Sequence, residues 1–171
     1  MLIAIFACVF AIIADQWTKF LAFAMEVPAR TVTSFFTIQK AKNTGAAFGM
    51  LGKIEHSQLV LIPLSILTIV VLVFLIRANK KFSTMVKVPI GLIMGGALSN
   101  LYDRICFGYV KDFIFFHYKR FSWPIFNLAD VFICVGVVIL IISTFKHHPK
   151  AQPVAKQDEK PKEEIKCTIS Q

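Results

Sequence analysis

The sequence predicts an all-α polytopic membrane protein with four transmembrane helices. Of its 171 residues 56% are hydrophobic and only 17% are charged, whereas a water-soluble domain usually carries about 25% charged residues. Apolar runs recur that are long enough to cross a hydrocarbon core of about 30 Å. The Lys and Arg residues that give a net charge of +9 flank these runs. This arrangement favours anionic lipids over nucleic acid as the partner of the basic residues.

One membrane domain, residues 1–145, is the size that the chain length predicts. Residues 146–171 mix lysines, acidic residues and prolines with few large apolar side chains, which is typical of a disordered tail. The expected spans are about 2–23, 59–76, 85–101 and 126–145.

The first span, residues 2–23, is interrupted by Asp15 and Lys19. Their i, i+4 spacing places both on one helical face, where they can pair. The charged pair falls where a cleaved signal peptide needs an unbroken apolar run, so we expect a retained helix. Two interpretations of the pair stay open: an ion pair whose charged ends reach the membrane interface, and a direct part in catalysis.

The polar segment 26–57 follows. Residues 31–39 are rich in β-branched and aromatic side chains, which favours short strands. The segment from Asn43 to Gly52 predicts a turn that leads into a small-residue stretch suited to the membrane surface. An ordinary Asn/Gly turn is the alternative.

The spans 59–76 and 85–101 are joined by a loop that contains Arg77, Lys80, Lys81 and Lys87. The small residues Gly91, Gly95, Gly96 and Ala97 in the second of these spans suit close helix packing. The positive-inside rule makes the basic loop and the basic tail cytoplasmic. Both termini are then cytoplasmic, and segments 26–57 and 103–123 lie on the outer side.

Every aspartate outside the tail is thereby placed near the outer face of the membrane. Carboxylates are costly in or near hydrocarbon, so a functional site is the default hypothesis. For Asp130 a structural interpretation is equally open, because Asn127 and Asp130 are three residues apart at a helix start, where they can act as caps. The aspartates concerned are Asp15, Asp103, Asp112 and Asp130.

A carboxylate pair is the chemistry that the residues leave open. The sequence has no H-E-x-x-H or G-x-S-x-G motif, and its four cysteines are widely scattered, so zinc, serine and cysteine chemistry are disfavoured. Two neighbouring aspartates share a proton and cleave amides as general acid and general base, with no metal or cofactor.

The chain resembles the bacterial lipoprotein signal peptidases (type II signal peptidases), which are intramembrane aspartic endopeptidases. The resemblance covers residues 11–142 and includes five motifs in order. They are Asp15-Gln-x-Thr-Lys19, Asn43-Thr-Gly-Ala-Ala-Phe-Gly49, Gly95-Gly-Ala-Leu-Ser-Asn100-Leu-Tyr-Asp-Arg104, Gly108-Tyr-Val-Lys-Asp112-Phe113 and Pro124-Ile-Phe-Asn127-Leu-Ala-Asp130.

The resemblance implies four transmembrane helices, a small extracytoplasmic β-cradle and a short amphipathic external helix. It implies a monomer in the bacterial cytoplasmic (inner) membrane with its site at the outer face. The substrate would be a diacylglyceryl-modified prolipoprotein, cut just before the lipidated cysteine. By resemblance Asp112 and Asp130 are the catalytic dyad, and no metal or cofactor is expected. The implied binding or supporting residues are Asp15, Lys19, Asn43, Gly45, Asn100, Asp103, Arg104, Asn127 and Ala129.

Two positions depart from the family pattern. Ser99 replaces a usual glycine, which predicts looser helix packing there. Lys111 replaces an apolar residue, and its ammonium would favour the ionised form of Asp112 if it turned inward, although neighbours in an extended segment point to opposite faces.

Rival functions remain open at this point. A small or proton-coupled transporter also places carboxylates near a membrane face, but internal repeats and broken helices are missing. A presenilin-like aspartic protease would need a G-x-G-D motif that the chain lacks. A purely structural membrane protein would not need the four aspartates.

Overall fold

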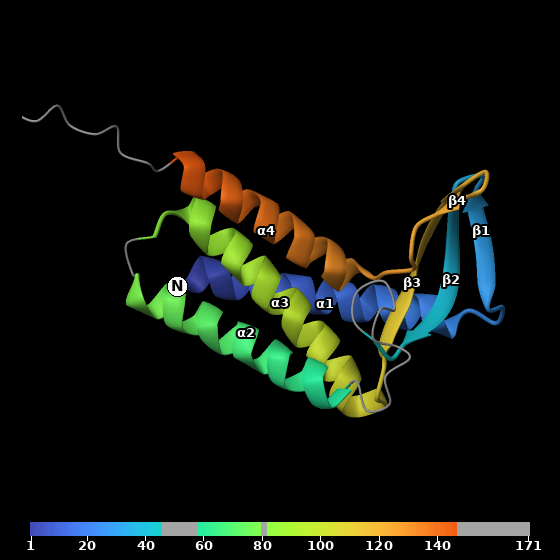
Figure 1. Ribbon diagram of the computed structural model, residues 1–171, viewed down its shortest axis with the longest axis horizontal. Helices are drawn as coiled ribbons and strands as arrows, with labels where there is room; N and C mark the ends of the chain where they lie inside the picture. The colour runs from blue at the N-terminus through green and yellow to red at the C-terminus, as the bar shows by residue number, and fades with distance from the viewer. Residues whose placement is uncertain (46–57, 80–81, 147–171) are drawn as a thin grey trace, which may run out of the picture.

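The computed structural model describes residues 1–45, 58–79 and 82–146. It contains four helices at one end and an antiparallel sheet at the other (Figure 1). The elements are α1 (Leu2–Ala24), β1 (Ala29–Thr33), β2 (Phe36–Asn43), α2 (Gln58–Ala78), α3 (Thr84–Phe107), β3 (Val110–Tyr118), β4 (Phe121–Ser122) and α4 (Leu128–Lys146).

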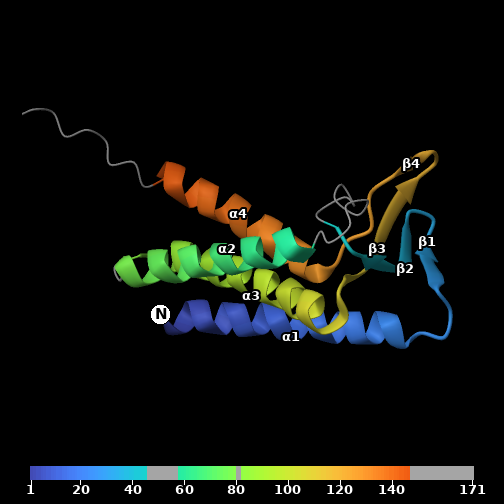
Figure 2. The ribbon, with the colours of Figure 1, turned by 60° about the horizontal axis from the view of Figure 1, so that its bottom comes forward.

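Helix α3 is the centre of the bundle. In Figure 1 it lies between α2 and α4, and in Figure 2 α1 runs along its other side. Small residues allow this close packing, because a Cβ added at Gly95 would lie 2.5 Å from the carbonyl oxygen of Cys8 in α1. A Cβ added at Gly96 would lie 2.6 Å from the carbonyl oxygen of Ala129 in α4. The predicted small-residue stretch therefore packs against two different helices.

Replacing Gly95 with alanine should destabilise the fold by about 1–3 kcal/mol, the usual cost of overpacking a well-packed interior. The obstacle at this position is backbone, which has no rotamer to change, so α1 and α3 would have to separate. Thermal unfolding in detergent micelles measures the effect. Ile105→Ala, at a 64% exposed position of the same helix, is the control and should change stability little. A Gly95→Ala protein as stable as the wild type would contradict the tight contact.

The outward faces of the helices are apolar, which is the reverse of a soluble bundle. On α1, Phe6 and Phe20 are 71% and 63% exposed while Asp15 and Lys19 are fully buried. Helices α1, α2 and α3 are long and apolar enough to cross a membrane, and the apolar stretch of α4 is shorter. Helices that are surrounded by lipid are expected to have their charged groups in the interior of the bundle and apolar groups on its outer surface.

The strands pair in the order β1-β2-β3-β4, all antiparallel. The predicted strands within residues 31–39 are confirmed as parts of β1 and β2. The central β2–β3 pair joins two distant parts of the chain, and it sets Ala41 opposite Asp112 and Asn43 opposite Val110. Strand β3, which contains Asp112, lies at the end of the bundle where α4 begins (Figure 2).

The helix ends differ from the expected spans mainly in α3. This helix continues past the expected end at residue 101 to Phe107, so Asp103 and Arg104 are helical and not part of an external loop. Gly108 ends it in the left-handed conformation, with φ 77°, which glycine adopts without steric cost. The predicted membrane-surface stretch within residues 43–52 lies outside the described residues from position 46 on, and the predicted tail lies outside them beyond Lys146.

Candidate active site

Asn127 connects the two aspartates that the sequence analysis proposed as a dyad. Its side-chain Nδ2 donates to Asp112 Oδ1 at 2.6 Å, and its backbone N–H donates to Asp130 Oδ2 at 3.3 Å. Asp112 comes from β3 and Asp130 from the first turn of α4. The two carboxylates, one from a strand and one from a helix, therefore share one hydrogen-bonding partner.

The first turn of α4 is a reciprocal cap. The Asp130 N–H donates to Asn127 Oδ1 at 3.1 Å, while Asp130 Oδ2 accepts the Asn127 N–H. This is the capping-box arrangement, so the structural interpretation of Asp130 is confirmed. It does not exclude the functional interpretation, because Asp130 Oδ1 is directed away from the cap and accepts from Asn100 Nδ2 at 2.9 Å.

Asp112 is 2% exposed and is held from two sides. Besides Asn127, it accepts a hydrogen bond from Asn43 Nδ2 at 2.9 Å. The Gly45 N–H donates to Asn43 Oδ1 at 2.9 Å and so fixes which end of that amide faces the carboxylate. Burial, followed by the nearby charge of Asp130, raises the pKa of Asp112 to about 6, against the opposing effect of the Asn43 and Asn127 hydrogen bonds.

A buried charge cluster lies beneath this pair. Lys19 Nζ is 2.6 Å from Asp15 Oδ2 and 2.8 Å from Asp103 Oδ2. It also donates to Asn100 Oδ1 at 2.9 Å, which orients the Asn100 amide so that its Nδ2 faces Asp130. All three charged side chains are at most 1% exposed. The interpretation in which the Asp15–Lys19 pair reaches the interface is therefore wrong, because the bundle interior encloses it.

Two further polar residues complete the cluster, and the sequence analysis gave neither a role in it. Ser99 Oγ donates to Asp15 Oδ2 at 2.7 Å and accepts from Gln16 Nε2 at 2.8 Å. Gln16 also donates to Asp103 Oδ1 at 3.1 Å. Ser99 is fully buried, and its hydroxyl is hydrogen-bonded to both Asp15 and Gln16; the effect of the serine on the tightness of helix packing stays a prediction. The sequence signals that could have indicated these roles are adjacency: Ser99 precedes Asn100, and Gln16 follows Asp15.

Asp15 ties this cluster to α4. Its Oδ1 accepts the backbone N–H of Ala129 at 2.8 Å, and Ala129 itself is fully buried. This N–H belongs to the first turn of α4, where no intrahelical acceptor exists. The carboxylate of the first helix therefore fixes the position at which the Asp130-bearing helix starts.

Within the part of the chain that the structure describes, neither Arg104 nor Lys111 forms an ion pair with a carboxylate, and Lys111 points outward, as strand alternation predicts. Among the described residues, no carboxylate oxygen lies within 4 Å of the Arg104 guanidinium, and its Nη1 donates to the backbone oxygen of Asn100 at 3.4 Å. The cation that pairs with Asp103 is Lys19, not Arg104. The Lys111 ammonium lies 3.7 Å from the centre of the Phe107 ring, on the face of the sheet opposite to Asp112.

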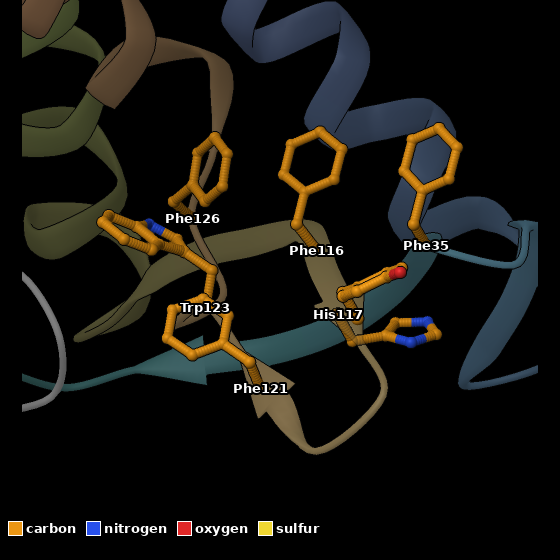
Figure 3. A pocket seen from close by; sticks show the side chains of 7 residues that line it. Phe35, Phe116, His117, Phe121, Trp123 and Phe126 are labelled. Carbon is orange, nitrogen blue, oxygen red and sulfur yellow. The ribbon is translucent and has the colours of Figure 1, made fainter.

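The described residues form a hollow beside Asp130 and a second hollow on the sheet. One of about 470 Å³ runs along α4 from Asn43 and Asp130, with apolar walls that include Val131, Ile133 and Val135. The second, of about 510 Å³, is lined mainly by aromatic side chains of the sheet. Figure 3 shows the Phe126, Phe116 and Phe35 rings in a row on one side and His117 pointing to the other. No pattern in the sequence predicted this aromatic hollow.

The comparisons with known proteins agree with one another. Residues 7–146 match the family described as Signal peptidase (SPase) II. The lipoprotein signal peptidase of Clostridium tetani is 39% identical over 142 residues, which are 81% of this chain and 89% of that protein. The lipoprotein signal peptidase of Teredinibacter turnerae is 42% identical over 135 residues, which are 76% and 79% of the two chains.

A solved structure shows the same fold. It is described as a bacterial membrane enzyme, has 32% sequence identity and a TM-score of 0.75, and the alignment covers 88% of this chain and 93% of that one. The family match spans the four helices and the sheet, including every residue of the candidate site. The chain therefore belongs to the signal peptidase II family.

Proposed function

We propose that the chain is an aspartic endopeptidase that removes the signal peptide from diacylglyceryl-modified prolipoproteins, cutting just before the lipidated cysteine. Membership of the family supports a protease that acts on lipoprotein precursors. The observation that carries the aspartic mechanism is the connection of Asp112 and Asp130 through Asn127. Carboxyl groups held together in a buried site share a proton.

The proposed reaction uses the pair as one unit. The ionised carboxylate takes a proton from a water molecule, whose oxygen attacks the scissile carbonyl carbon. The protonated carboxyl donates to the carbonyl oxygen, and proton transfer to the amide nitrogen then releases the new amino terminus. Asn100 and Asn127 hold the two carboxyl groups in place and so fix the reacting geometry.

The hollow along α4 suits the proposed substrate. Asp130 and Asn43 lie at its polar part, and α4 supplies an apolar wall that continues from them. A lipid chain or an apolar signal-peptide segment would be buried there as the scissile bond reaches the carboxylates. The lipid on the cysteine would keep that bond at the depth of Asp112 and Asp130.

The decisive experiment uses purified protein in detergent micelles. It is incubated with a prolipoprotein that carries diacylglycerol on its cysteine and, separately, with the unmodified precursor. Mass spectrometry should show a product that begins at the lipidated cysteine from the first substrate and none from the second. Cleavage of both precursors at equal rates would refute the requirement for the lipid, and cleavage of neither would refute the function.

The pH dependence of cleavage should follow the raised pKa of Asp112. Above about pH 6 this carboxyl loses its proton, both members of the pair are then charged, and kcat/KM should fall about tenfold per pH unit. Asn43→Ala removes a hydrogen bond that favours the ionised form, so the alkaline limb should move to higher pH. The pH profiles of wild type and variant, measured at fixed ionic strength, test this. An alkaline limb that stays at the same pH in Asn43→Ala would contradict it.

We also propose that α4 is a fourth transmembrane span, and that both termini are cytoplasmic in the bacterial inner membrane. Met1 and the end of α4 lie at the end of the bundle opposite to the sheet (Figure 1), so they share one side. The basic loop and tail assign that side to the cytoplasm.

Orientation is testable by labelling single cysteines with a membrane-impermeant thiol reagent in a cysteine-free background. Thr33→Cys, in β1, should be labelled in intact cells, and Asn79→Cys, after α2, only after lysis. Both positions are exposed, so failure to react reflects sidedness and not burial. Labelling of position 79 from outside would invert the proposed topology.

A further inference from the structure

Two lysines face each other across the centre of the sheet. The register of β2 and β3 sets Lys42 directly opposite Lys111, so their side chains stand on the same face. Like charges in this arrangement repel each other and destabilise the sheet. An anion bound between the two lysines would reduce this repulsion and stabilise the sheet.

This face is not the face of the active site. Successive residues of a strand point to opposite sides, and Asp112 and Asn43, which follow the two lysines in β3 and β2, are hydrogen-bonded to each other on the other side. The Asp103 carboxylate approaches Lys111 only through the Lys111 backbone N–H, at 3.1 Å. It is already paired with Lys19. Among the described residues, the ion pairs within 4 Å involve only Lys19, so neither Lys42 nor Lys111 has a carboxylate partner there.

The two ammonium groups rest on aromatic rings. Lys111 Nζ is 3.7 Å from the ring centre of Phe107 and 5.9 Å from that of Phe23. Lys42 Nζ is 5.0 Å from the ring centre of Tyr109. Cation–π contacts hold a cation in place without neutralising it, so the pair keeps its positive charge. The side chain of Lys42 is exposed and that of Lys111 is half-buried.

The position of these rings relates the lysines to the membrane. Phe23 lies in the last turn of α1 and Phe107 ends α3. In the turns that precede Phe23 and Phe107, the same two helices carry large exposed side chains. The exposed fractions are 61% for Trp17, 63% for Phe20, 52% for Tyr102 and 64% for Ile105. Aromatic residues at the end of an apolar helix mark the headgroup level of a bilayer. In the proposed bilayer placement, the lysines would therefore lie just above a surface that acyl chains cover.

We propose that Lys42 and Lys111 form a binding site for the phosphate of an anionic phospholipid headgroup in the outer leaflet. The phosphate would lie between the two ammonium groups and remove their repulsion. The acyl chains of the same lipid would cover the exposed side chains at the outer ends of α1 and α3. This site is independent of the proposed peptidase chemistry and rests only on the placement of the helices in a bilayer.

The test measures lipid retention by native mass spectrometry. Purified protein in an uncharged maltoside detergent is titrated with phosphatidylglycerol or with phosphatidylcholine. Wild type should bind the anionic lipid selectively. The double variant Lys42→Gln/Lys111→Gln should bind it about 25-fold more weakly, since each basic residue near an anionic headgroup contributes about a fivefold effect.

Matched variants separate charge from structure. Lys119→Gln removes another exposed lysine that lies over an aromatic ring, 5.5 Å from that of Tyr118 at the far end of β3, and should leave lipid binding unchanged. Lys42→Arg/Lys111→Arg should retain binding, which also shows that the two positions tolerate substitution. Inorganic phosphate at the same concentration should not displace the lipid, because it lacks the acyl chains.

Several outcomes would overturn the proposal. They are equal binding of the anionic and zwitterionic lipids by wild type, unchanged retention of phosphatidylglycerol by the Gln double variant, and equal loss in Lys119→Gln. Displacement of the lipid by inorganic phosphate would replace a lipid site with a simple anion site. Because activity is not the readout, failure here and failure of the peptidase proposal are distinguishable.

Discussion

Asp112→Asn and Asp130→Asn are each expected to abolish cleavage, lowering turnover by about 10⁴-fold or more, the usual cost of removing a group that acts directly in proton transfer. An amide has nearly the same shape as the carboxyl that it replaces, but it neither shares a proton nor accepts one from water. Asn43, Asn100 and Asn127 can still contact the substituted side chains, so substrate binding and the fold should remain largely intact.

The double variant and Asp103→Asn make this prediction specific. Substituting both Asp112 and Asp130 should cost little more than substituting either, because the two act as one unit. Asp103 pairs with Lys19 and accepts from Gln16, so Asp103→Asn should lower the yield of folded protein more than the turnover per folded molecule. The measurement is turnover normalised to correctly folded protein. A well-folded, inactive Asp103→Asn beside an active Asp112→Asn would move the catalytic role to Asp103.

Lys19→Met is expected to destabilise the protein by about 3–5 kcal/mol, the cost of removing one partner of a buried ion pair. The methionine leaves Asp15 and Asp103 buried without their cation, and Asn100 loses the donor that orients its amide. Unfolding in detergent micelles gives the change in free energy. Arg77→Gln, at an exposed position at the end of α2, should change it little.

A triple variant distinguishes lost charge pairing from lost packing. Lys19→Met combined with Asp15→Asn and Asp103→Asn removes both uncompensated carboxylates while keeping their shapes. It should recover a large part of the stability lost in Lys19→Met. If the triple variant were as unstable as the single variant, the loss would come from the volume of the side chain and not from its charge.

The sequence predicted the helices better than it predicted their ends. Apolar runs are a strong signal, because each must cover the thickness of a bilayer. The end of α3 was placed too early, since Asp103 and Arg104 are the residues that normally leave a membrane. In the folded chain Asp103 is fully buried against α1 and Arg104 is half-buried, and Gly108 marks the true end of the helix. Composition alone does not reveal such tertiary protection.

The sequence predicted which residues form the candidate site, but only partly which of them form hydrogen bonds and ion pairs with one another. The aspartates and asparagines were recognisable by type and by motif. Their pairing was not, because Lys19 selects Asp103 through the packing of α1 against α3, which no local spacing encodes. The same holds for Ser99: read along the chain it suggested a packing defect, whereas in three dimensions it meets Asp15 and Gln16. For Lys111, strand alternation predicted that the side chain points away from Asp112, and in the structure its ammonium lies over the Phe107 ring.

The bridge formed by Asn127 has a consequence for biosynthesis. Asp112 is synthesised before Asp130, but its partner Asn127 belongs to the segment that begins α4. A nascent chain that has inserted only its first three helices therefore contains the sheet aspartate without the second carboxylate or the bridging amide. If Asp112 and Asp130 are the proposed catalytic pair, hydrolytic activity would begin only when the last helix has docked against α3.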